Sequence, residues 1–249
     1  DKDISKMSDR FDEIRYAMDS LSTYLIMRHS YTIPNEECNI EYKSLIDKKI
    51  TAFGDLLDFL TNGNANEKQL IEKLLPMHPY TAFLCSTISN YVGSSNRSVI
   101  KFMHDEVSGF GAFLNDENSY NSDKLLTADA LWDFFYTEFD SDPLCATFTG
   151  IFTSFEGKVK AQGEDFLRVF KAILLLNALS PKFNKDIALL TPDEKVLRYV
   201  FIGDRASKKL TDILNYLDEN KIVTRNIFDQ FKITGTSYNQ NEMNLQRQK

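Results

Sequence analysis

Helix-breaking residues are rare in this sequence, and their rarity constrains the fold more than any other feature. The 249 residues include only 10 glycines and six prolines. Between these breaks, apolar residues recur at spacings of three and four, the period of one face of a helix. The sequence therefore predicts a mainly α protein. The first such stripe predicts one face of a packed helix, with a coiled coil as the alternative; it consists of Ile4, Met7, Phe11, Ile14, Met18, Leu21 and Leu25.

The composition is that of a globular protein, with 43% apolar and 26% charged residues. The longest apolar run, from Ala172 to Ser180, is too short to cross a bilayer, so we expect no membrane partner. Cys38, Cys85 and Cys145 lie far apart without metal or redox spacing, which favours a cytoplasmic location. The chain does not begin with methionine and opens without a signal peptide, so we expect a piece cut from a longer protein.

Charge is unevenly distributed along the chain. The net charge of −7 argues against nucleic-acid binding by the whole surface. The stretch from Lys195 to Lys232, however, carries eight lysines and arginines against five acidic residues, whereas residues 1–194 carry 19 against 30. The basic excess therefore coincides with one unit near the C-terminus.

Polar breaks divide the predicted helices into two groups. We expect a helical domain over residues 1–106, a linker loop over 107–126, a helical and winged-helix domain over 127–236, and a disordered tail over 237–249. In the first domain Asn66 is expected to cap a short helix, Pro79 to begin the next, and Ser95 to cap the one after it. The expected helices cover residues 44–60, 66–75, 79–93, 95–103, 127–139, 143–155 and 164–179.

The segment after residue 190 has the order of a winged helix. Thr191, Pro192 and Glu194 are expected to form a capping box at the start of a helix, and residues 207–220 form a second helix. Two short strands, Ile222–Arg225 and Gln230–Thr234, are then predicted around a turn. Together with the helix at 164–179, these elements predict a winged helix whose wing is the small β-hairpin.

No catalytic constellation is visible. His29, His78 and His104 are isolated, and none has a partner at metal-ligand spacing, so no metal site is predicted. The nearest approach to a phosphate-binding loop, "GIFTSFEGKV" from Gly150 to Val159, has the wrong spacing. We expect the chain alone to hold no cofactor and to catalyse no reaction.

One arginine nevertheless suggests an anionic ligand. Arg97 is predicted in the first turn of a helix, where the helix dipole disfavours a cation unless an anion lies nearby. Its surroundings, "LLPMHPYTAFLCSTISNYVGSSNRSVIKFM", together with "SDRFDEIRY" and "TADALWDFF", resemble segments of large bacterial AAA+/STAND-type ATPases of phage-defence, BREX-like islands. The chain has Ser95-Asn96-Arg97 where many of these relatives have Asn-Glu-Arg. The matching residues are His78, Pro79, Thr81, Ala82, Asn96, Arg97, Ser98 and Phe102.

The resemblance implies the lid and winged-helix part of such an ATPase, with the P-loop core upstream in the same polypeptide. ATP and Mg²⁺ would then bind to the full-length parent. Arg97, with Asn96, resembles the sensor 2 motif that reaches the γ-phosphate, and His78-Pro79 resembles a turn beside adenine. The alternatives are a surface or core-bridging role for Arg97 and a helix-capping role for His78.

The winged helix would provide the docking surface for DNA or for a partner protein. The residues expected at its groove and wing are Arg205, Lys208, Lys209, Arg225 and Lys232. Two other classes of function stay open, namely a stand-alone winged-helix DNA-binding regulator and a non-catalytic helical adaptor.

Overall fold

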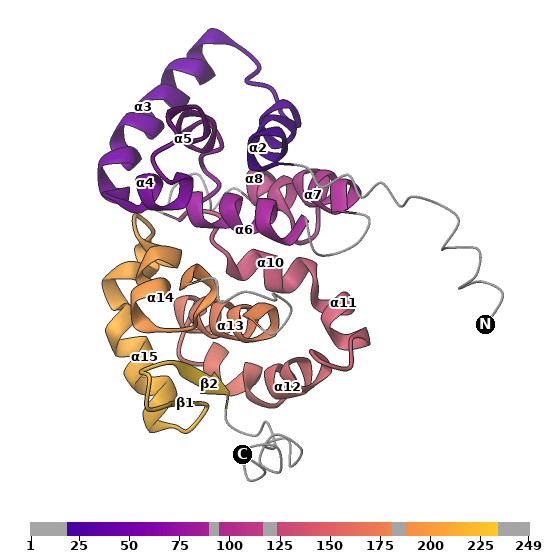
Figure 1. The fold of residues 1–249 in the computed structure, drawn as a ribbon, viewed down its shortest axis with the longest axis vertical. Helices are drawn as coiled ribbons and strands as arrows, with labels where there is room; N and C mark the ends of the chain where they lie inside the picture. Colours follow the sequence, from indigo (N-terminus) through magenta and orange to yellow (C-terminus); the bar gives the residue numbers. More distant parts are fainter. Residues whose placement is uncertain (1–18, 90–94, 117–123, 181–187, 234–249) are drawn as a thin grey trace, which may run out of the picture.

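The computed structural model describes residues 19–89, 95–116, 124–180 and 188–233, with the backbone alone for residues 89 and 95–98. These residues form a mainly α fold with one small antiparallel sheet, which confirms the predicted fold class. The helices lie in two groups along the long axis of the molecule (Figure 1). We call residues 19–116 the N-terminal half and residues 124–233 the C-terminal half.

The N-terminal half contains helices whose boundaries differ from the prediction at two places. Residues 44–60 do not form one helix, because Gly54, with φ 51°, ends α3 and α4 follows it. Asn64, and not Asn66, caps α5, since its side-chain oxygen accepts from the Asn66 and Glu67 amides. The elements are α2 Ser20–His29, α3 Glu36–Phe53, α4 Leu56–Thr61, α5 Ala65–Glu72, α6 Pro79–Ser89, α7 Ser95–His104 and α8 Phe110–Asn115.

The predicted N-terminal stripe is only partly within the described residues, because its members from Ile4 to Met18 lie outside them. Helix α2 begins at Ser20 with Asp19 as its cap and buries Tyr24 and Met27. Leu25, an expected inward residue, is 39% exposed. The apolar face of α2 therefore differs from the stripe, because packing against α5 and α6 selects the side with Tyr24.

The expected linker loop contains packed structure in its described part. Phe110 and Phe113, one helical turn apart, are buried on α8. Farther along, Leu125 and Leu126 are buried, and Leu126 bridges to Met77 as a parallel pair. The prediction of a polar loop was wrong at these positions, because two aromatic residues at helical spacing outweigh the glycines around them.

The C-terminal half follows the predicted order of helices and hairpin. Asp193, and not Thr191, caps α14, because its carboxylate accepts from the Val196 amide at 2.8 Å. The expected capping box is therefore wrong. Lys208 and Lys209 lie on a 3₁₀ turn before α15 rather than on the helix itself. The elements are α10 Asp129–Phe134, α11 Tyr136–Ser141, α12 Ala146–Lys160, α13 Glu164–Leu179, η2 Ala188–Leu190, α14 Glu194–Phe201, η3 Arg205–Lys209, α15 Leu210–Glu219, β1 Val223–Arg225 and β2 Phe231–Ile233.

Backbone pairing and a buried side-chain hydrogen bond join the hairpin to the rest of the half. We call residues 223–233, strands β1 and β2 with their turn, the wing. Thr224 pairs with Lys232 across the strands, and a further antiparallel bridge joins Asp193 to Gln230. The buried Asn177 of α13 donates to the Phe231 carbonyl at 3.0 Å. The wing is thus fixed against both α13 and the start of α14.

The two halves share one hydrophobic core. The rings of Phe102 on α7 and Phe134 on α10 meet edge to face, with centroids 5.1 Å apart. The rings of Phe59 on α4 and Tyr199 on α14 also meet across the boundary, tilted by 36° with centroids 5.7 Å apart. Aromatic contacts of this kind add to the burial of apolar area, so the boundary between the halves is a packed interface.

Candidate functional site

His78 lies at the start of α6, where it caps the helix and bridges to the other half. Its Nδ1 accepts from the Tyr80 amide at 3.1 Å, and its Nε2 is 2.7 Å from the Ile202 carbonyl oxygen. This pairing requires the tautomer with the proton on Nε2. The side chain has no exposed surface, and burial lowers its pKa to about 4. Both ring nitrogens are therefore used within the protein, and a nucleotide contact would need one of these bonds to break.

Pro79 is the first residue of α6, as the sequence predicted, and is buried. Proline suits this position because the missing N–H would have no partner within the helix. Asn96 and Arg97 lie in the first turn of α7, which begins at Ser95. The side chains of Asn96 and Arg97 are outside the described residues, so only the predicted position on the helix can be compared with the structure.

The turn Ile202–Asp204, which joins α14 to η3, receives contacts from both halves. The Nζ of Lys49, a lysine only 7% exposed on α3, donates to the Gly203 carbonyl at 3.0 Å. His78 contacts the carbonyl of the preceding residue, as described above. The carboxylate of Asp204 accepts from the backbone amides of Leu125 and Ala206, at 2.7 and 2.8 Å. Ile202, Gly203 and Asp204 thus form hydrogen bonds with the residue before α6, with α3 and with the segment before α10, respectively.

Arg168 on α13 completes this cluster. Its Nη1 and Nη2 donate to the two carboxylate oxygens of Asp204, at 3.0 and 3.1 Å. Nη2 also reaches the hydroxyl of Thr127 at 2.7 Å, and Nε lies 3.4 Å from a carboxylate oxygen of Asp129. Burial lowers the pKa of the guanidinium, but the charges of Asp129 and Asp204 outweigh this effect and raise it. Burial raises the pKa of the Asp129 carboxyl, although Arg168 opposes the change.

Arg168 and Asp204 were not among the residues predicted from the sequence. One signal was available: Arg168 precedes the apolar residues of α13, which are buried from Val169 to Leu179 except at Lys171, and a charged side chain there requires a partner. The sequence did not indicate which acid would supply it.

Arg205, expected to face DNA, is instead part of a surface extension of this cluster. Its guanidinium binds Glu164 and, at 3.0 Å, Asp165. Lys124 also binds Glu164, at 2.9 Å. Burial raises the pKa of Glu164, but the hydrogen bonds and charges of Lys124 and Arg205 dominate and bring it to about 2. The charge of Arg205 is therefore largely neutralised.

Arg225, the arginine expected on the wing, is likewise paired with carboxylates. Its Nη1 lies 3.1 Å from Asp229 and its Nη2 lies 3.4 Å from Glu194. Glu194 also binds Arg198 across one helical turn. The guanidinium of Arg225 covers the ring of Phe231, 4.8 Å from its centroid. This alternation of acids and bases leaves little net charge beside the wing.

Lys208 and Lys209 are exposed, and no hydrogen bond or ion pair engages their side chains within the described part of the chain. Lys232 lies on β2 with an exposed side chain, and partial burial lowers its pKa. Of the five predicted nucleic-acid contacts, Arg205 and Arg225 are thus paired with carboxylates. Lys208 and Lys209 stay available to a phosphate.

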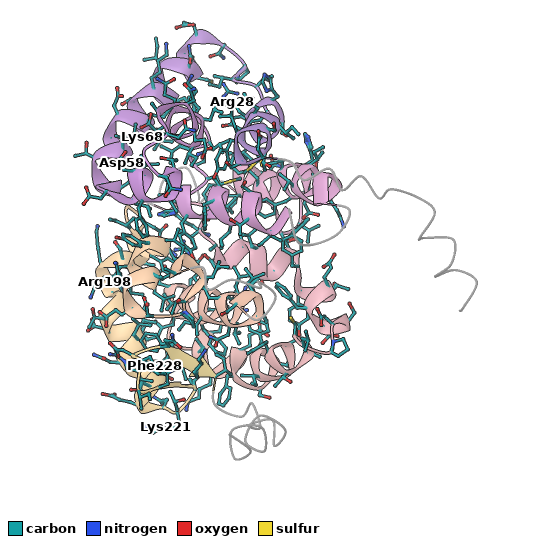
Figure 2. All side chains as sticks on the ribbon, viewed as in Figure 1. Arg28, Asp58, Lys68, Arg198, Lys221 and Phe228 are labelled. Carbon is teal, nitrogen blue, oxygen red and sulfur yellow. The ribbon has the colours of Figure 1, made fainter. Side chains whose placement is uncertain are left out.

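Two large apolar residues at the tip of the wing are exposed to solvent. Ile227 is 92% exposed and Phe228 is 73% exposed. The Asn226 side chain fixes their turn by accepting from the amides of Phe228 and Gln230 at 2.9 and 3.0 Å. Asp229, with φ 59°, closes the turn. Figure 2 shows Phe228 on the same side of the molecule as Arg198. Turn positions usually hold polar residues or glycine, so this tip departs from what folding alone would require.

Among the described residues there is neither a candidate metal site nor a candidate membrane span. No group of three or more His, Cys, Asp or Glu side chains there could hold a metal ion. None of the helices described is both long enough and apolar enough to span a membrane.

Comparisons of the chain with protein-family models, with curated proteins and with solved structures found no match.

Proposed function

We propose that this chain is the lid and winged-helix part of an AAA+/STAND-type ATPase, and that its wing docks on a protein surface. The ATPase assignment depends on the resemblance of residues 76–103 to that family. The position of Arg97 on the first turn of α7 is compatible with it. In this proposal Arg97 binds the γ-phosphate, while ATP and Mg²⁺ bind to the core of the same polypeptide.

The observation that carries the docking part is the exposure of Ile227 and Phe228 on a fixed turn. Large apolar side chains that are exposed to solvent lower the solubility of a protein and add nothing to its core. Such groups commonly mark contact sites. An aromatic anchor that enters a partner's pocket can supply much of the binding energy of an interface. A protein partner also agrees better than DNA with the charges, because Glu194 and Asp229 neutralise the arginine of the wing.

The parent reading frame gives the first test. An ATPase lid requires a Walker A motif upstream of residue 1 in the same frame. A start codon near residue 1 would remove the ATPase part of the proposal and leave the stand-alone regulator or the helical adaptor.

The docking part is tested by photocrosslinking in the full-length protein. Benzoylphenylalanine replaces Phe228 at the wing tip, and the same group replaces Leu144, which is 70% exposed between α11 and α12, as the control. We expect a discrete protein crosslink from position 228 and none from position 144, with mass spectrometry identifying the partner peptide. Crosslinks to added duplex DNA alone would favour the DNA-binding alternative, and no crosslink at 228 would contradict docking through the tip.

A further inference from the structure

The turn Ile202–Asp204 belongs to the C-terminal half but receives two hydrogen bonds from the N-terminal half. Lys49 of α3 and His78, the residue before α6, donate to successive carbonyl oxygens of the turn, at 3.0 and 2.7 Å. The donors are 154 and 124 residues away from their acceptors in the chain. Both donors are buried, so separation of the halves would leave each without this partner unless water replaced it.

The same turn is fixed from its own side. Asp204 holds Arg168 through two hydrogen bonds and accepts from the Leu125 amide, so the turn cannot shift without disturbing a buried ion pair. Breaking a buried pair of this kind is strongly unfavourable because it leaves an uncompensated charge. A movement of α3 or α6 is therefore resisted at the turn by groups on α13 and before α10.

Gly203 brings the two halves into direct contact at this point. Its φ of +78° favours glycine, and a Cβ there would lie 2.9 Å from Cε1 of Phe53 and 3.5 Å from Cβ of Ala52. The backbone of the turn thus lies against the last turn of α3. Gly63, between α4 and α5, has nearly the same φ of +75°, but a Cβ there would meet nothing within 4 Å.

We propose that the turn Ile202–Asp204 is a mechanical latch that makes the lid-like half and the wing-bearing half move and unfold as one body. This inference goes beyond the proposed function, because it needs neither a nucleotide nor a partner. Without the latch, the aromatic contacts between the halves would still hold them together but would let them loosen separately. With it, a displacement of α6 reaches the wing through α14, which ends at the turn.

The test compares Gly203→Ala with Gly63→Ala in the whole chain during urea unfolding. Trp132, the single tryptophan, lies buried on α10 and reports the C-terminal half, whereas far-ultraviolet ellipticity reports the helices of both halves. Coincident curves indicate one cooperative transition. We expect coincidence for the wild type and for Gly63→Ala, which carries the same backbone strain. For Gly203→Ala we expect the two probes to differ by roughly tenfold in the apparent unfolding constant at the fluorescence midpoint.

A second pair of variants covers the case in which Gly203→Ala does not fold. Lys49→Met keeps the apolar stem and removes the amine that binds Gly203, while Lys68→Met removes a half-exposed lysine that pairs with Asp58 inside the N-terminal half. We expect the probes to separate for Lys49→Met and to coincide for Lys68→Met. Separate transitions in the wild type, or coincident curves in every folded latch variant, would overturn the proposal.

Discussion

Arg168 on α13 and Asp204 at the start of η3 form a two-point ion pair, with N–O distances of 3.0 and 3.1 Å, in the interior of the protein. The side chains are 5% and 0% exposed. The planar guanidinium matches the carboxylate, and two parallel bonds fix the orientation of both groups. The pair therefore determines where the turn before η3 lies relative to α13.

Replacement of Arg168 by methionine should destabilise the fold severely. The variant leaves Asp204 buried without its cation, which typically costs about 3–5 kcal/mol. Arg198→Met is the matched control, because Arg198 pairs with Glu194 at the surface and is 54% exposed, where a pair is worth about 0–1 kcal/mol. The free energy of unfolding in urea measures both. Equal losses for the two variants would contradict the role given to Arg168.

Stability should fall as the pH decreases from about 6.5 toward 4, with His78 as one cause. Burial lowers its folded pKa to about 4, below the ordinary value of 6.5, so the unfolded chain binds more protons in this window. The contribution is present above pH 6.5, is lost toward pH 4, and amounts to on the order of 3 kcal/mol. His78→Gln should flatten the curve of the unfolding free energy against pH between pH 5 and 7, and a slope equal to that of the wild type would contradict this role of His78.

The chain by itself should not hydrolyse ATP. The sequence has no loop to hold the phosphates, and the described residues contain no acidic or histidine cluster for a metal ion. A phosphate-release assay with the purified chain and Mg²⁺ measures this. Turnover that a single substitution within the chain abolishes would reveal an active site that we have missed.

In a full-length ATPase, Arg97→Ala should lower turnover far more than it lowers stability. Our proposal gives Arg97 a charge-assisted bond to the γ-phosphate, and loss of such a group in phosphoryl transfer typically costs about 10²-fold or more. Lys101→Ala, on the same helix, serves as the control. A folded Arg97→Ala protein with normal turnover would return Arg97 to an ordinary surface or bridging role.

Binding of duplex DNA should be weak and should depend on Lys208 and Lys209. These exposed lysines have no carboxylate partner in the described structure, unlike Arg205 and Arg225. Alanine at both lysines should reduce the slope of log affinity against log salt by roughly 2, as two fewer phosphates are neutralised. Fluorescence anisotropy at several salt concentrations gives the slope. A larger loss on changing Arg205 and Arg225 would mean that their ion pairs open on DNA.

The local elements of this fold could be predicted because their causes are local. The apolar period and flanking residues of α13 predicted its span, Pro79 predicted the start of α6, and the β-branched segments before and after residue 227 predicted the two strands of the wing. Errors arose where two local signals competed. Asp193 displaced Thr191 as the cap of α14, and Phe110 with Phe113 made a helix in a segment that reads as a loop.

The sequence by itself determined the helical class, the order of the helices and the hairpin at the end, because spacing and capping act within a few residues. Only the tertiary structure decided that His78 would donate to the Ile202 carbonyl, that Arg168 would bind Asp204, and that Arg225 would form an ion pair with Glu194. In each case the partners lie 31 or more residues apart. The sequence shows that a charged or polar side chain will need a partner if it is buried. The packing of the helices then determines which group lies close enough to be that partner.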